Sequence, residues 1–199
     1  MTQTLPAEYS EEERRWLLWL AHASIRAAVR GNPLATPETP NPHLRQPRGA
    51  FVTLHEHGEL RGCIGMMVAA EPLDETVREM ARAAALEDPR FDPVRADELD
   101  QLQIEISVLS PMFAIAPGDV VVGRHGLMVS YEGRRGILLP QVAPEWGWDR
   151  ETFLAQTCRK AGLPMDQWRR GANLEAFTAE VFGENEPGES WKANETLKP

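Results

Sequence analysis

A thiol with glycines close on either side is the feature of this sequence that most suggests chemistry. Cys63 lies in the segment Arg61-Gly62-Cys63-Ile64-Gly65, within a run that has the composition of a β-strand. Glycine in a strand costs stability and often marks the close approach of a ligand or of another backbone. We therefore interpret Gly62 and Gly65 as the place where a substrate reaches the backbone, with Arg61 favouring the thiolate of Cys63. The alternative is a buried structural cysteine beside a glycine bulge.

His125 is the candidate general base for this thiol. It lies between Gly123 and Gly126, in a flexible turn that can deliver an imidazole to Cys63. The pair would then act as nucleophile and base. The alternative is an ordinary surface turn, because sequence does not reveal which residues are close in space.

Glu105 and Ser107 supply a carboxylate and a hydroxyl on one face of a predicted strand, opposite its apolar residues. If this face lines a cleft, both side chains can orient a substrate, with Glu105 also a candidate catalytic group. Glu105 can also pair with Arg61 or Arg90. The alternative is a solvated strand face.

Two loops carry further candidate substrate-binding residues. Asp88 and Arg90 flank Pro89, where they either hold a turn together or line the cleft. Gln141 and Glu145 lie in a loop with two tryptophans, and loops of this kind often carry binding residues. For this second loop the alternative is a packing corner anchored by the tryptophans, which are Trp146 and Trp148.

Two weaker arrangements remain open. His55 and His57, two residues apart on a predicted hairpin, could form a metal pair with Cys63, the alternative being exposed turn histidines. Four arginines could converge on an anionic ligand, the alternative being scattered surface charges; these are Arg45, Arg48, Arg61 and Arg90. Because nucleotide-binding, serine-elbow and metalloprotease motifs are all missing from the sequence, we assign no cofactor and no metal.

Composition limits the class of protein. The formal net charge of −9 argues against nucleic acid as a partner, because phosphate binding needs concentrated Lys and Arg. We expect no membrane span, because no apolar run approaches the ~20 residues that a bilayer requires. The acidic start of the chain lacks a signal-peptide layout, and the only two cysteines, Cys63 and Cys158, suit free thiols in a reducing compartment. These features predict a cytoplasmic protein.

The elements that must position these residues follow from periodicity and turn chemistry. Ser10 and Glu13 form a capping box for a helix that Gly31 ends, and Pro72 opens a second helix. His57-Gly58 joins two strands of a hairpin, 51–55 and 59–64. The remaining elements are a proline-rich loop at 32–48, strands at 102–108, 120–122, 127–131, 137–139 and 175–182, and a helix that Asp149 caps.

This order of elements does not alternate as βαβ units do, so it favours an α+β fold with a mixed or antiparallel sheet flanked by helices. We expect a single domain over residues 1–184, with a smaller β-rich subdomain within about 112–148, and a polar tail at 185–199.

Several of these segments resemble the AMMECR domain family, in particular its prokaryotic branch, AmmeMemoRadiSam system protein A. The resemblance spans about 170 residues, and its motifs are LRGCIG from Leu60, DPRFDP from Asp88, EISVLSP from Glu105, VGRHGL from Val122 and GILLPQVAPEWGWD from Gly136. It implies two subdomains with a cleft between them, and Arg61, Gly62 and Cys63 in the family signature. It also implies Memo-like and radical SAM proteins as partners. We therefore expect a small-molecule enzyme that uses Cys63, or alternatively a non-catalytic ligand-binding or adaptor module.

Overall fold

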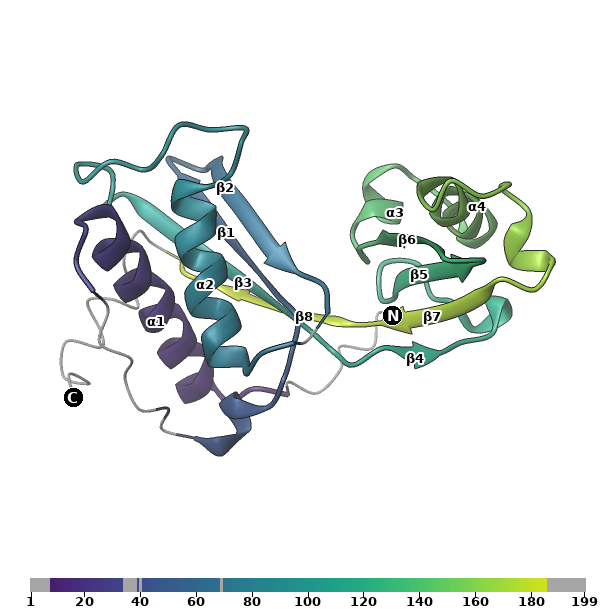
Figure 1. Cartoon of the computed structure of the whole chain (residues 1–199), viewed down its shortest axis with the longest axis horizontal. Coiled ribbons are helices and arrows are strands. Elements are labelled where there is room, and N and C mark those ends of the chain that lie inside the picture. Colours follow the sequence, from purple (N-terminus) through teal and green to yellow (C-terminus); the bar gives the residue numbers. More distant parts are fainter. Residues whose placement is uncertain (1–7, 34–38, 40, 69, 186–199) are drawn as a thin grey trace. The chain divides into compact units, whose positions relative to one another are not determined.

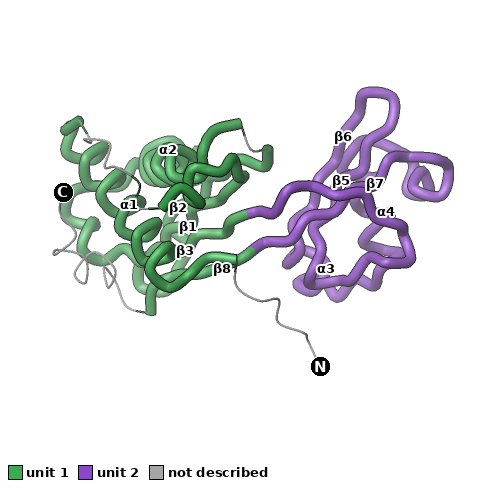
Figure 2. The backbone as a smooth tube through the Cα atoms, turned by 90° about the horizontal axis from the view of Figure 1, so that it is seen from below, with its two compact units in different colours: residues 1–108, 180–199 green, residues 109–179 purple. Residues whose placement is uncertain are grey.

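The chain divides into two compact units. The computed structural model describes residues 8–33, 39, 41–68 and 70–185. One unit comprises residues 1–108 together with 180–199, and the other comprises 109–179 (Figure 2). The second unit therefore extends beyond the subdomain expected within 112–148, because a helix and a strand that follow residue 148 belong to it.

The first unit is a four-stranded sheet in the order β2-β1-β3-β8, with helices α1 and α2 lying over one of its faces (Figure 1). Strand β1 is antiparallel to both β2 and β3. The elements of this unit are α1 (Glu11–Val29), a short 3-10 helix (Pro42–Arg45), β1 (Ala50–Glu56), β2 (Glu59–Met66), α2 (Leu73–Leu86), β3 (Leu102–Leu109) and β8 (Ala179–Gly183).

The core of this unit lies between the helices and the sheet. The predicted capping box is confirmed, since Ser10 accepts from the backbone of Glu13 and the Glu13 carboxylate accepts from the backbone of Ser10. Helix α1 then buries apolar residues that recur at helical spacing, including Leu17 and Ile25. They belong to one cluster with alternate residues of β1 and β3, namely Val52, Leu54, Ile104 and Ile106.

The second unit is another four-stranded sheet, in the order β4-β7-β5-β6. Its core includes Phe153, Leu154 and Cys158 of α4, which packs on β5 and β6. The elements are β4 (Phe113–Ala114), a 3-10 helix (Pro117–Asp119), β5 (Gly126–Tyr131), β6 (Arg134–Leu138), α3 (Val142–Glu145), α4 (Arg150–Lys160), a second 3-10 helix (Gln167–Arg169) and β7 (Asn173–Phe177).

Two sequence expectations are wrong. The strand expected at 120–122 is a turn, because the ring of His125 accepts the backbone N–H of Val121 and the backbone N–H of His125 bonds to the carbonyl of Val121. The strand expected at 175–182 is two strands that belong to different sheets. They separate at Thr178, whose backbone N–H and C=O both bond to Ser110.

The α+β class with antiparallel pairing is confirmed, with helices and two sheets in the described residues. The proline-rich loop contains the 3-10 helix at Pro42–Arg45, while residues 34–38 and 40 lie outside the described part. Except for Asn185, the expected tail also lies outside it. Within the described ranges, no helix combines the length and apolar character that crossing a membrane would require.

Candidate active site

A β-bulge in the β1–β2 hairpin determines which way Cys63 faces. His57 and Gly58 adopt positive φ angles of 53° and 81°, as in the tight turns that favour hairpins. His55 pairs with Leu60, but Leu54 pairs with Gly62, so Arg61 is an extra residue in β2. A one-residue shift exchanges the two faces of a strand. The bulge therefore brings Cys63, rather than Gly62, to the face that does not meet the helices.

Cys63, Thr53 and Glu105 form a row across three strands on this face. Thr53 of β1 pairs with Cys63 of β2 on one side and with Glu105 of β3 on the other. All three residues are half-buried. The Thr53 hydroxyl donates a hydrogen bond of 3.2 Å to the sulfur of Cys63. Half-buried residues of these three strands alternate with the core positions. Six of them are called the thiol face here: Phe51, Thr53, His55, Cys63, Glu105 and Ser107.

Both glycines near the thiol have packing roles. A Cβ on Gly62 would lie 2.3 Å from the backbone oxygen of Ala84, so this glycine lets α2 approach β2 closely. A Cβ on Gly65 would lie 2.1 Å from the ring of Phe51, which pairs with it across the hairpin. The close approach inferred from the sequence is therefore made by protein atoms at both positions.

Asp88 and Arg90 fix the backbone of Cys63 at the edge of the sheet. The buried carboxylate of Asp88 accepts the backbone N–H of Cys63 at 2.8 Å, and Arg90 donates to the carbonyl of Cys63 at 3.3 Å. Arg90 also donates to both Asp88 oxygens, at 2.9 and 2.7 Å. The hydrogen bonds from Arg90 hold the pKa of the Asp88 carboxyl well below its usual range, against the opposing effect of burial. The two residues thus hold the backbone that carries the thiol, and the Arg90 guanidinium also interacts with the Cys63 side chain.

The guanidinium of Arg61, which the sequence interpretation expected to favour the thiolate of Cys63, is bound to other groups. It donates to both oxygens of Glu98, at 2.9 and 3.2 Å, and to the carbonyl of Asp92. This hydrogen bonding lowers the pKa of the Glu98 carboxyl. The expected pairing of Glu105 with Arg61 or Arg90 is also wrong, because both arginines bind other carboxylates.

The four arginines that could have converged on an anion bind carboxylates of the chain instead. Each has its own carboxylate partner, so the charges are compensated locally. The pairs are Arg45 with Asp74, Arg48 with Glu8, Arg61 with Glu98, and Arg90 with Asp88.

His125 belongs to the second unit, where it holds a turn together. Its Nδ1 accepts the backbone N–H of Val121 at 3.1 Å, and its ring packs edge-on against Phe113. The side chain is buried, and burial lowers its pKa, with the charge of Arg124 adding to the effect. The imidazole is therefore a neutral acceptor at Nδ1 near pH 7.

The loop with the two tryptophans also lies in the second unit. Gln141 precedes α3, and Glu145 ends it; both are exposed. Trp146 is 71% exposed and stacks on Trp148 with ring centroids 6.1 Å apart. Trp148 packs against the core of this unit, as the sequence interpretation of a tryptophan-anchored corner predicted, while Trp146 presents a free aromatic surface.

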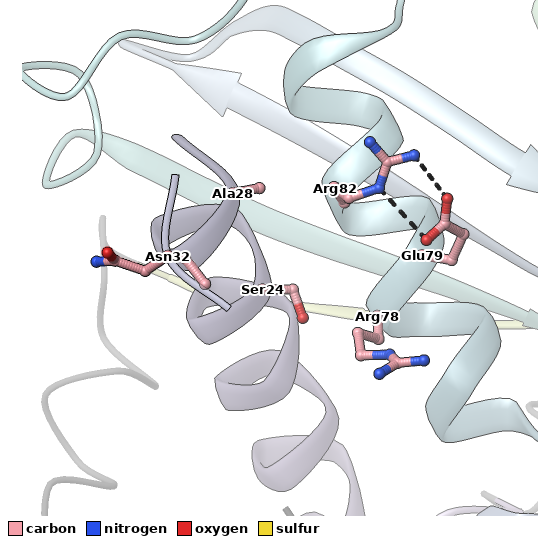
Figure 3. Close-up of a pocket in the computed structure, with 7 residues that line it drawn as sticks. Ser24, Ala28, Asn32, Arg78, Glu79 and Arg82 are labelled. Atoms are coloured by element: carbon pink, nitrogen blue, oxygen red, sulfur yellow. Dashed lines mark hydrogen bonds and ion pairs between the residues drawn. The ribbon is translucent and has the colours of Figure 1, made fainter. Parts of the chain in front are cut away.

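Two hollows elsewhere in the molecule do not include Cys63. One, of about 300 Å³, lies between α1 and α2; Figure 3 shows Ser24 pointing toward α2, and Arg82 bound by Glu79. Arg82 also pairs with Glu87, so the charge of this arginine is compensated. The other, of about 320 Å³, is lined by Leu154, Trp168 and the start of α4. In the described part of the chain, no cluster of three or more His, Cys, Asp and Glu residues could hold a metal ion.

Comparison with known proteins identifies the family. A family model described as AMMECR1 matches residues 18–182. The chain belongs to the AMMECR1 family. It is 45% identical over 190 residues to a protein of Thermococcus gammatolerans, covering 89% of this chain and 93% of that protein. It is 43% identical over 188 residues to a protein of Methanothermobacter thermautotrophicus, covering 90% and 98% of the two chains.

A solved AMMECR1-family structure has the same fold. It is the crystal structure of the uncharacterized protein PH0010 from Pyrococcus horikoshii, which matches with a TM-score of 0.78 and 40% sequence identity. The match covers 91% of this chain and 96% of that one. The resemblance noted in the sequence is thereby confirmed for family and fold.

Sequence reasoning did not find Thr53, and it considered His55 beside Cys63 only as a possible metal ligand. A plain hairpin around His57-Gly58 would pair Thr53 with Gly62, and Cys63 with Val52. Only the bulge at Arg61 changes this register, and no residue type in the segment requires a bulge. Within the AMMECR1 family motif, the glycine at position 62 is the available signal, because glycine in a strand often accompanies a bulge.

Proposed function

We propose that this AMMECR1-family chain is a cysteine-dependent enzyme that acts on a small molecule bound over the thiol face. Cys63 is the nucleophile, and Thr53 stabilises its thiolate through the hydroxyl hydrogen bond. Glu105 and Ser107 orient the substrate. By family resemblance, the enzyme works with a Memo-like protein and a radical SAM protein.

The observation that carries this proposal is the row of thiol, hydroxyl and carboxylate across three adjacent strands. Cys63 is half-buried rather than enclosed, and its sulfur accepts a hydrogen bond from Thr53. A donor to sulfur favours the thiolate, which is the reactive form. The backbone of Cys63 is held on its outer side by Asp88 and Arg90, which supports a fixed nucleophile.

The role of His125 as general base stays a prediction. Its Nδ1 is occupied by the N–H of Val121, so a proton would have to be exchanged through Nε2. His55 lies on the thiol face itself, on the same side of β1 as Thr53. Diagonal neighbours on adjacent strands lie ~7–8 Å apart, within reach of an aromatic side chain. His55 is therefore a second candidate for the base.

A thiol-reactivity measurement tests the proposal. The folded protein is treated with iodoacetamide at pH 7, and alkylation of Cys63 and Cys158 is followed separately by peptide mass spectrometry. We expect Cys63 to react at least as fast as a free model thiol, and Cys158 to resist. Cys158 is a matched internal control because it is buried and burial raises the pKa of its thiol. No alkylation of Cys63 in the folded protein would rule out a nucleophilic role.

A second candidate is a non-catalytic adaptor, and Trp146 is the observation that favours it. The indole of Trp146 is 71% exposed, and tryptophan is enriched among residues that dominate binding energy. The test is co-purification with the Memo-like and radical SAM proteins of the same cell. Loss of association in Trp146→Ala, but not in Cys63→Ala, would favour the adaptor. Met165→Ala is the control, since Met165 is also exposed in the second unit.

A further inference from the structure

Glu105 differs from the fully buried acidic residues of the same unit, which have partners in the chain. Asp88 pairs with Arg90, Glu98 pairs with Arg61, and Asp74 accepts from Thr39 and Arg45. Glu105 is half-buried, yet within the described residues its carboxylate has neither a hydrogen bond nor an ion pair. Its carboxylate is therefore available to a group that the chain does not itself supply.

The neighbourhood of Glu105 leaves room for such a group. On β1 its neighbour is Thr53, a short side chain whose hydroxyl already donates to Cys63. On the β8 side lies Gly183, where a Cβ would come within 3.4 Å of the Cβ of Glu105. Because Gly183 has no side chain, this residue of β8 does not cover the carboxylate. A larger residue at this position would cover it.

Glu105 and Cys63 lie on the same row of the thiol face, two strands apart. Neighbouring strands are spaced ~4.8 Å apart, so the backbones that carry the carboxylate and the thiol are separated by ~10 Å. A small molecule can contact both residues at once. Its group at the Glu105 end must be a hydrogen-bond donor, and a charged donor binds a carboxylate about twice as strongly as a neutral one.

We propose that Glu105 forms a subsite for a cationic group, a protonated amine or a guanidinium, on the molecule whose other end reacts at Cys63. This inference rests on the proposed function, since it names the substrate class of the same face. The protein is acidic, with a net charge of −9, which also favours the approach of cations. An anionic group at the same position would be repelled by the carboxylate.

Charged thiol reagents test the subsite in the intact protein. Three methanethiosulfonates are compared: a neutral methyl reagent, a trimethylammonium reagent with a six-carbon spacer, and a sulfonate reagent with the same spacer. The Cys63 thiolate attacks the sulfenyl sulfur, forms a mixed disulfide and releases methanesulfinate. Rates at Cys63 are followed by mass spectrometry. Dividing each charged-reagent rate by the neutral-reagent rate for the same variant cancels changes in the thiol itself.

We expect Glu105→Gln to lower the cationic-to-neutral ratio by about three- to tenfold, and to raise the anionic-to-neutral ratio. Glu59→Gln is the matched control, because Glu59 is an exposed carboxylate on the same strand as Cys63. It should change both ratios by less than twofold.

Equal ratios in the wild-type protein and Glu105→Gln would overturn the subsite while leaving Cys63 as a reactive thiol. The same fall in Glu59→Gln would also overturn it, because the effect would then reflect overall charge. If Cys63 did not react even with the neutral reagent, the proposed function would fail, and this inference with it.

Discussion

The hydroxyl of Thr53 donates a hydrogen bond of 3.2 Å to the sulfur of Cys63 across the β1–β2 pair. The two residues face each other because Arg61 is an extra residue in β2. In a hairpin without the bulge, Cys63 would point to the helix-covered side of the sheet, opposite Val52. The bulge thus decides whether this thiol is a core residue or part of an accessible face.

Removing the donor should make Cys63 less reactive. We expect Thr53→Val to slow alkylation of Cys63 at pH 7 by about three- to tenfold, because a hydrogen bond of ordinary strength no longer stabilises the thiolate. The measurement is the iodoacetamide rate at Cys63. Thr53→Ser restores the hydroxyl and should recover most of the rate. If valine and serine gave the same rate, the hydrogen bond would have no influence on the thiol.

The Asp88 carboxylate should stabilise the fold in a pH-dependent way. We expect Asp88→Ala to lower the free energy of unfolding by about 2 kcal/mol, because the backbone N–H of Cys63 and the Arg90 guanidinium lose their acceptor. The folded-state pKa of Asp88 lies below its unfolded value. Its contribution is therefore complete above the unfolded pKa of ~3.9 and is lost as the pH falls below it.

Urea unfolding of wild-type protein and Asp88→Ala from pH 3 to pH 7 measures this difference. It should be constant above about pH 5 and shrink toward pH 3. Asp97→Ala is the control, since Asp97 pairs with Arg95 on the surface, where both side chains are more than two-thirds exposed. A difference that grew on acidification would contradict the assigned role of Asp88.

Local sequence signals predicted much of the fold. The capping box at Ser10, the tight turn at His57-Gly58 and the period-two pattern at 102–108 each correspond to an observed element. The run at 175–182 was misread as one strand. No glycine or proline interrupts this run, and the hydrogen bonds to Ser110 that separate β7 from β8 involve a residue far away in sequence.

The candidate site was predicted less completely. Cys63, Glu105 and Ser107 do lie on one face, but Thr53 was missed because its register depends on the bulge. The sequence interpretation placed a substrate at Gly62 and Gly65. In the structure, Ala84 and Phe51 occupy the space that side chains at these positions would need. A glycine in a strand indicates that another group comes close to the backbone. The sequence does not show whether this group is a ligand or another part of the protein.

Gly62 offers a test of its packing role. We expect Gly62→Ala to lower the free energy of unfolding by about 1–3 kcal/mol, because the new methyl group would lie 2.3 Å from the Ala84 oxygen and push β2 away from α2. Chemical denaturation measures the change. Gly118→Ala is the control, because a Cβ there meets nothing within 4 Å. A neutral effect of Gly62→Ala would show that helix and strand separate at no cost.

His125 should be neutral, with its proton on Nε2, throughout the physiological pH range. Nδ1 accepts the N–H of Val121, and burial lowers the pKa of the ring. Nitrogen-15 NMR distinguishes the two neutral tautomers directly. We expect the Nε2-protonated form at pH 7 and a titration midpoint below ~6.5. A proton on Nδ1, or a midpoint above the ordinary value, would contradict the assignment.

The same shift predicts how stability depends on pH. Because the folded-state pKa of His125 lies below that of the unfolded chain, the unfolded state binds the proton first on acidification. The contribution of His125 to the free energy of unfolding is therefore complete above about pH 6.5 and falls as the pH drops below that value. In His125→Asn, the side-chain oxygen can still accept from Val121 but does not titrate. The wild-type protein should lose stability relative to this variant between pH 7 and pH 5, and a difference that did not change over this range would contradict the assigned pKa shift.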